Sequence, residues 1–284
     1  MQTLKRISNR LFYLPPYQET DRPILAAITG EEKTLLIDAG NSSSHAKLFL
    51  DQLEERNIKG DLLVLTHWHW DHVFGMREIQ APIIAHDETY NKIKELQELS
   101  WEDKELDQRV KEGIEIPFCA DAIKKELGNE RDIFLPDPDL TFETRMKVNL
   151  GGVTCLIEHV GGDHSHDSSI VYIQEEKALF LGDCLYANLY SKNWNYTIDN
   201  TLQLIQQIEK YDADIFFLSH HDRPLTKEDF SSFLQLMKSA AFLTKKHEGN
   251  EEAVVQEMSE SKQRKLSEEE METITFFVNG FSGN

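Results

Sequence analysis

The sequence predicts an α/β fold in which two β-sheets lie in the middle and helices cover them on the outside. Short apolar runs of strand length alternate with segments of helical periodicity, and histidines recur where predicted strands end. At 284 residues with 40% hydrophobic content, the chain is long enough to bury the core that such a fold requires.

The predicted strands are short and are separated by glycine, proline or charged residues. Residues 61–66 form a nearly continuous apolar run, which is typical of a strand buried on both faces. The other strands are predicted at residues 11–14, 24–29, 34–40, 147–150, 153–160, 169–173, 178–183 and 214–219.

Helices are predicted between these strands and after them. Residues 44–56 carry apolar side chains at helical spacing behind a run of serines that can cap the helix. The segment from about 87 to 127 is rich in Glu and Lys and has apolar residues at roughly helical intervals, so we interpret it as a helical insertion. Further helices are predicted at about 201–211, at 227–246, and through the Glu-rich run near Glu268.

The net charge and the cysteines indicate which partners and which cellular location to expect. The net charge of −20 should repel phosphodiester backbones, so we expect a small-molecule substrate and no nucleic acid. Cys119, Cys155 and Cys184 are too few and too widely spaced for the disulfide framework of a secreted domain. Because no signal peptide or membrane segment is evident, we expect a cytoplasmic protein. A homodimer is compatible with the sequence, which leaves the oligomeric state open.

The strongest chemical signal directly follows the predicted strand at 61–66, where His67, His69, Asp71 and His72 lie within six residues. In extended backbone alternate residues share one side, so His67 and His69 can reach one ion. Asp71 and His72 come after the chain begins to turn and can face a second ion about 3.5–4 Å away, the spacing typical of two-metal hydrolases. A lone histidine is usually only hydrogen-bonded, whereas four such groups together predict a metal site.

This segment, THWHWDH, resembles the His-x-His-x-Asp-His signature of the metallo-β-lactamase fold superfamily. Four further segments are similar to that family in the same order, namely TLLIDAG, GGDHSHDSS, FLGDCLY and FLSHHDRP. The resemblance implies a four-layer αβ/βα sandwich. It also implies a hydrolase domain at residues 1–225, which contains the insertion, and a helical extension at 226–284 packed on the same domain.

The resemblance further implies which residues bind two metal ions. His67, His69 and His164 would hold one ion. Asp71, His72 and His221 would hold the other, and Asp183 would bridge the two. His166 lies two residues from His164 and could compete with it, and either His220 or His221 could be the last ligand. We prefer His164 and His221.

The chemistry that the resemblance implies is hydrolysis of an ester, thioester or lactone by a water whose pKa two metals lower. Asp71 would orient this water or move its proton. Tyr186, three residues after Asp183, either directs its hydroxyl at the substrate carbonyl, as in the acyl-homoserine lactonase branch of the superfamily, or is an ordinary packing residue. Imidazole and carboxylate ligands suit Zn²⁺ best, with Mn²⁺ or iron as alternatives. The alternative functions are a small-molecule phosphodiesterase and a non-catalytic metal-binding sensing module.

The insertion at 87–127 follows directly on the ligand segment. We expect it to form a lid that shapes the substrate pocket, although a packing elaboration or a dimer interface would give the same pattern. Cys184 is expected to be a small buried residue, and Trp68 and Trp70 are expected to pack. The remaining histidines are expected to be structural or solvent-facing, namely His45, His86, His159 and His247.

Overall fold

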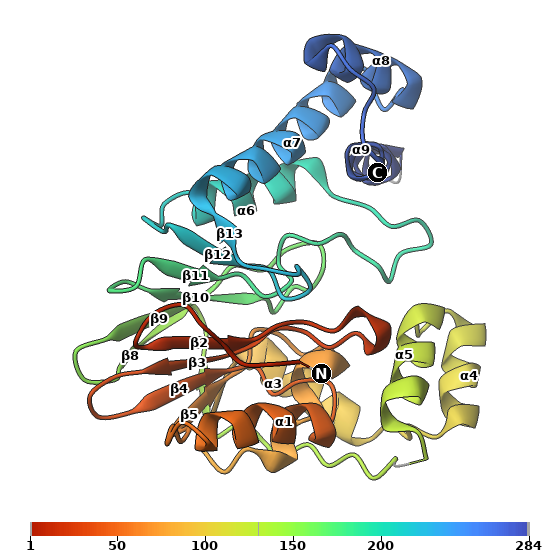
Figure 1. The fold of residues 1–284 in the computed structure, drawn as a ribbon. Helices are drawn as coiled ribbons and strands as arrows, with labels where there is room; N and C mark the ends of the chain where they lie inside the picture. Colours follow the sequence, from red (N-terminus) through yellow and green to blue (C-terminus); the bar gives the residue numbers. More distant parts are fainter. Residues whose placement is uncertain (1, 130, 283–284) are drawn as a thin grey trace.

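The computed structural model describes residues 2–129 and 131–282, and it has the four-layer α/β sandwich that the sequence predicts (Figure 1). Two β-sheets pack face to face in the middle, and helices cover the outer face of each. None of the helices in the described ranges is long and apolar enough to cross a membrane.

The first sheet has seven strands in the order of the chain, antiparallel from β1 to β4 and parallel from β4 to β7. These strands are β1 (Lys5–Arg6), β2 (Leu11–Leu14), β3 (Leu25–Thr29), β4 (Thr34–Ile37), β5 (Leu62–Val64), β6 (Ile83–His86) and β7 (Leu140–Phe142).

The second sheet has six strands in the order β13-β12-β11-β10-β9-β8, antiparallel except between β11 and β12. These strands are β8 (Arg145–Asn149), β9 (Thr154–His159), β10 (Ser169–Ile173), β11 (Ala178–Phe180), β12 (Ile215–Phe217) and β13 (Leu225–Thr226).

Helices of the first half of the chain pack on the first sheet, and those of the second half pack on the second sheet. The first set comprises α1 (Ser43–Glu54), the single turn α2 (Trp70–Val73), α3 (Asp87–Gln97), α4 (Asp103–Glu112) and α5 (Pro117–Leu127), with 3-10 turns η1 (Gln18–Thr20) and η2 (Met76–Glu78). The second set comprises α6 (Ile198–Ile208), α7 (Lys227–Lys246), α8 (Glu251–Lys262) and α9 (Glu268–Ser282).

Two helices begin with a side-chain cap of the kind that the capping rules favour. The Ser42 hydroxyl accepts a hydrogen bond from the His45 amide at the start of α1, and Thr226 caps α7 in the same way through the Asp229 amide. The predicted break in the insertion falls between α4 and α5, where Gly113 ends α4 with a φ of 71°. Residues 87–127 therefore contain the helices α3, α4 and α5, while the proposed division at residue 225 stays a prediction.

The sequence pattern does not reveal strands β1, β6, β7 and β13, each of which has only two to four residues. These runs form because a neighbouring strand supplies their hydrogen bonds, a long-range contact that no local pattern shows.

Apolar side chains fill the space between the two sheets. Phe217 of β12 is 1% exposed, and its ring stacks on Phe180 of β11 at 4.0 Å and meets the edge of Tyr13 of β2 at 5.5 Å. Burial of this interface holds the two sheets in fixed relation.

The carboxyl ends of two parallel strand pairs meet at one edge of this sandwich. Ile37 of β4 pairs with Val64 of β5, and Phe180 of β11 pairs with Phe217 of β12. A backbone hydrogen bond of 2.8 Å from the Ser169 amide to the Thr66 carbonyl joins the two sheets at this edge. Residues that follow these four strands are therefore brought together.

Candidate metal centre

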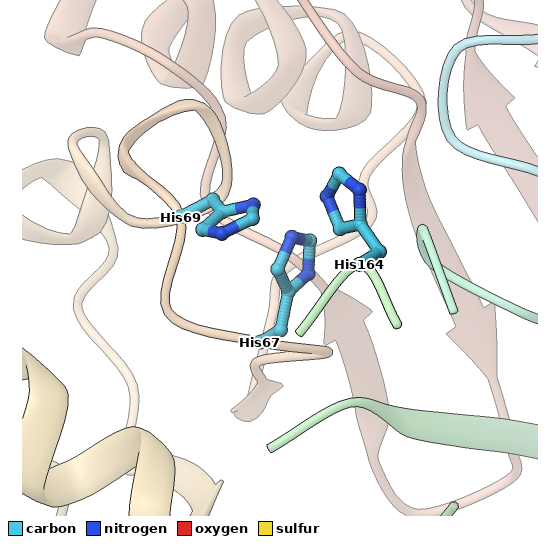
Figure 2. Close-up of side chains that lie close together, drawn as sticks. All are labelled: His67, His69 and His164. Atoms are coloured by element: carbon cyan, nitrogen blue, oxygen red, sulfur yellow. The ribbon is translucent and has the colours of Figure 1, made fainter. Parts of the chain in front are cut away.

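Three buried histidines from two loops form the first group at this edge (Figure 2). His67 and His69 follow β5, and His164 lies in the loop between β9 and β10. Their ring centroids lie 4.6 to 5.4 Å apart, and one nitrogen of each ring lies within 4.8 Å of the other two. Three imidazole nitrogens at this spacing could hold a divalent ion.

A second group contains two carboxylates and two histidines. Asp71 Oδ2 lies 3.1 Å from both His72 Nε2 and His220 Nε2. Asp183 Oδ2 lies 3.4 Å from His72 Nε2 and 3.3 Å from His220 Nε2. This group could hold a second ion.

Asp183 lies between the two groups. Its Oδ2 atom is 3.8 Å from His67 Nε2 and 3.4 Å from His164 Nε2, in addition to its contacts with the second group. The residue follows β11 and is 3% exposed. A carboxylate with this placement can contact ions in both groups.

Most ligand atoms of both groups have no hydrogen-bond partner among the described residues, although they are buried. These atoms are His67 Nε2, His72 Nε2, His164 Nε2, Asp71 Oδ2 and Asp183 Oδ1. Leaving so many polar atoms buried and unpaired is costly, and a bound cation would satisfy them. The donor set therefore fits divalent metal ions.

The opposite ring nitrogens of His72 and His164 are hydrogen-bonded to neighbours. His72 Nδ1 lies 2.7 Å from Asp38 Oδ2, and His164 Nδ1 lies 3.2 Å from the Ala187 carbonyl. Because both partners are acceptors, they hold the proton on Nδ1 and leave Nε2 free to bind a metal. His220 Nδ1 faces Asp21 Oδ1 at 3.4 Å.

The two groups differ in their electrostatics. Burial lowers the pKa of His67 well below its usual value and that of His69 to about 3, so these rings are neutral. Burial also opposes the charged form of His72, but the carboxylates of Asp71 and Asp38 outweigh it and raise the pKa well above 6.5. Protons therefore compete with a cation mainly in the second group.

The structure corrects the preference for His221 as the last ligand. The His221 side chain is exposed, and its Nδ1 lies 3.1 Å from the Arg223 carbonyl, away from the cluster. A turn closed by the His221 amide on the Leu218 carbonyl at 3.1 Å directs His220 to the centre and turns the next side chain outward. The sequence also left open a choice between His164 and His166. His164 lies in the first group, and the His166 side chain is exposed.

Tyr186 lies beside the centre, with its ring 6.0 Å from that of His164 and 6.1 Å from that of His220. Its hydroxyl oxygen accepts a hydrogen bond of 3.3 Å from the His220 amide. Burial raises the pKa of Tyr186 well above 10, and the nearby Asp183 raises it further, so the hydroxyl keeps its proton. The hydroxyl can therefore also donate a hydrogen bond.

His86 and His159 lie outside this centre and stack on each other at 3.8 Å. Their Nε2 atoms donate to the carbonyl oxygens of Glu143 and His166, each at 2.7 Å. These contacts tie β6 to the loop that carries His164.

A cavity of about 340 Å³ opens onto the centre. Its lining includes His69, Asp71, His164, Asp183, Tyr186 and His220 together with apolar side chains from distant segments. Sequence reasoning assigned no role to Asp21, Asp38 or the cavity residues Trp194 and Phe276. Asp38 lies within the matched segment TLLIDAG, which is a signal that could have identified it, whereas the other three stand in no motif.

Residues 26–220 match the family model described as the metallo-beta-lactamase superfamily. Because this match spans more than half of the chain, the protein belongs to the metallo-beta-lactamase superfamily. A beta-lactamase-like protein 2 homolog from Caenorhabditis elegans is 28% identical over 159 residues, which are 55% of this chain and 42% of that protein. The chain thus spans less than half the length of this curated relative.

Solved structures share the fold at low identity. A metallo-beta-lactamase from Pontibacter korlensis is 21% identical with a TM-score of 0.58, over 83% of this chain and 98% of that one. The stereoselective inverting sec-alkylsulfatase Pisa1 from Pseudomonas sp. is 17% identical with a TM-score of 0.68, over 99% of this chain and 49% of that one. At these identities the likeness shows the fold alone.

Proposed function

We propose that this chain is a metal-dependent hydrolase that uses a dinuclear centre to cleave an ester, thioester or lactone. The observation that supports this most directly is the convergence of unpartnered ligand atoms in two groups that share Asp183, beside a cavity large enough for a small molecule. The family membership supports the same chemistry.

In this proposal the first ion is held by His67, His69 and His164, the second by Asp71, His72 and His220, and Asp183 contacts both. We propose Zn²⁺, because a set dominated by neutral imidazoles with few carboxylates suits it better than Mg²⁺ or Ca²⁺. When bound, a pair of such ions supplies Lewis acidity and lowers the pKa of a water near them.

Two residues of the chain would act on the substrate. The Asp71 carboxylate, which would also hold the second ion, can accept the proton of the attacking water. The Tyr186 hydroxyl remains protonated and can donate a hydrogen bond to the carbonyl oxygen as negative charge develops there. The water adds to the carbonyl carbon, the bond to the leaving oxygen or sulfur breaks, and that atom takes up a proton.

The cavity favours an uncharged carbonyl compound. No Lys or Arg is among the described residues that line it, so nothing in this cavity outside the metal centre would pair with an anionic substrate group. This supports a carboxylic ester, thioester or lactone over a phosphodiester. The three cysteines are free and buried, which supports the reducing, cytoplasmic location that we propose.

The neighbours His220 and His221 provide a matched test of the metal centre. His220→Ala should lose about half of the bound metal, and kcat/KM should fall at least about 100-fold, because changes outside the ligand set already cost 10- to 100-fold. His221→Ala should retain both ions and activity. Mass spectrometry measures the metal content, and rates on a panel of lactones, thioesters and esters measure the activity. Equal losses in both variants, or full activity in chelator-treated protein, would contradict the proposal.

Tyr186→Phe tests the proposed hydrogen-bond donor. Removing one donor to a developing oxyanion costs on the order of 100- to 1000-fold in kcat. We expect a loss of that order with unchanged metal content and KM, because the ring still fills its place. An unchanged kcat would show that Tyr186 only packs.

A further inference from the structure

We propose that the substrate is an amphiphile whose apolar acyl chain lies in one recess and whose polar leaving group lies in another, with the scissile bond at the metal centre between them. This inference rests on the proposed function. Its basis is that two recesses of the surface share His69, His164 and Tyr190. We call them the aromatic cavity, which is the cavity described above, and the Lys92 groove, a recess of about 390 Å³ lined by residues of α3 and the loops around residues 163–168 and 188–190.

Most of the apolar wall of the aromatic cavity comes from four segments that are distant in the sequence. These segments are the start of α5, the loop after β11, α7 and α9, and they contribute Ile116, Phe118, Leu189, Tyr190, Trp194, Tyr196, Phe233 and Phe276. Figure 1 shows α5 and α9 on the same side of the molecule. Rings of this kind offer a large apolar contact area to an alkyl chain.

The charges of the aromatic cavity are all acidic. Apart from Asp21 and the ligand carboxylates, its charged side chains among the described residues are Glu269 and Glu272 of α9. They share a helix face with Thr273 and Phe276, which also line the cavity. An acyl chain that ends in a carboxylate would be repelled by this wall, whereas an uncharged chain would not.

The Lys92 groove has a different chemistry. Lys92 of α3 lines it, with its ammonium 5.8 Å from the centroid of the Trp68 ring and 2.7 Å from Glu95 Oε2, and the Asn91 and Asn188 amides lie in the same wall. Glu88, Asp163 and Asp167 also line the groove, and the carboxylates of Asp163 and Asp167 accept hydrogen bonds from Thr197 and Thr89. The groove also contains Ser165 and His166. A leaving alkoxide or thiolate gains negative charge as its bond breaks, so a cation and hydrogen-bond donors on its side favour departure.

The loop after β11 separates the two recesses. Ala187 and Leu189 line the aromatic cavity, Asn188 lines the Lys92 groove, and Tyr190 lines both. Along this loop the apolar side chains therefore line the aromatic cavity, and the Asn188 amide lines the Lys92 groove. The Tyr190 ring lies 5.6 Å from that of His69, which places the partition directly above the proposed metal ligands.

A substrate series tests the acyl side in the metal-loaded protein. For acyl thioesters from butanoyl to decanoyl with one common leaving thiol, kcat/KM should rise about fourfold per methylene, as expected for burial of a methylene group. Phe233→Ala should flatten this rise. Phe242→Ala is the matched control, because Phe242 lies on the same helix, is 66% exposed and lines neither recess, so it should leave the rise unchanged.

A second series tests the leaving-group side. Lys92→Gln should lower kcat/KM about two- to fivefold more for thiols that carry a carboxylate than for neutral thiols, as for a partly exposed ion pair. Lys104→Gln is the matched control, because Lys104 is exposed on α4 and lines neither recess. This variant should leave kcat/KM unchanged for both kinds of thiol. Tryptophan fluorescence with decanamide gives a readout without turnover, because Trp70 and Trp194 line the aromatic cavity. Binding should weaken in Phe233→Ala and not in Phe242→Ala.

The outcomes separate the two proposals. If hydrolysis requires His220 but is independent of acyl length, the hydrolase proposal stands and this inference fails. If no carbonyl substrate is cleaved, or decyl sulfate is cleaved faster than decanoyl thioesters, the carbonyl proposal fails. In that case decanamide binding sensitive to Phe233→Ala would still support the aromatic cavity, and equal binding by both phenylalanine variants would overturn it.

Discussion

Replacing Asp38 by Asn should weaken metal binding although Asp38 is not a proposed ligand. The Asp38 carboxylate accepts hydrogen bonds from the Thr66 amide at 2.8 Å and the Thr66 hydroxyl at 2.9 Å, and it lies 2.7 Å from His72 Nδ1. Asp38 has a φ of 58°, a left-handed conformation that Asn tolerates and Ala does not. Asp38→Asn therefore removes the negative charge and replaces one acceptor oxygen by an NH₂ group, while the backbone conformation is kept.

The size of the effect follows from these contacts. The Asn amide has one acceptor oxygen, so its NH₂ group must face either the Thr66 donors or the His72 Nδ1 proton. At least one buried donor then lacks a partner, which costs about 1–3 kcal/mol of folding free energy. His72 also loses the acceptor that orients it, and loss of such a contact lowers metal affinity about 10- to 100-fold.

Two measurements separate these effects. Chelator competition gives the metal affinity, and urea denaturation in excess chelator gives the stability of the metal-free protein. Asp61→Asn is the matched control, because Asp61 also accepts from a backbone amide, that of Thr34 at 2.8 Å, but precedes β5 at the end away from the metal centre. Metal affinity of Asp38→Asn within twofold of the natural protein, or an equal loss in Asp61→Asn, would refute this reasoning.

Three further outcomes are expected. Phe217→Ala removes the ring that stacks on Phe180 between the sheets and should lower the free energy of unfolding by about 3–5 kcal/mol in urea denaturation; a loss below 1 kcal/mol would contradict that packing. Arg264 holds the pKa of Glu270 at about 2, below its usual 4.5, so its stabilisation is present above pH 4.5 and lost as pH falls toward 2. The difference in urea midpoint between Glu270→Gln and the natural protein should therefore shrink from pH 7 to pH 3, and a constant difference would rule out the ion pair as its cause. Exchanging residues 87–127 for a short linker should change substrate preference and leave metal content intact, as measured on the acyl series; loss of metal instead would mean that the segment supports the centre.

The sequence alone determined the layers and most of the centre. The strands between the sheets appear as apolar runs because both faces are buried, and His67 to His72 are recognisable because adjacent residues of one loop share one site. Single candidate ligands such as His164 and Asp183 were found because each stands in a short segment that resembles the metallo-beta-lactamase superfamily.

Only the tertiary structure decided between His220 and His221, because one turn closed on Leu218 sets which of two adjacent side chains faces inward. It also brought Asp21, Trp194 and α9 to the cavity. These residues lie far apart along the chain, and each alone is an ordinary surface or core residue. Their proximity results from packing between layers, which no local pattern encodes.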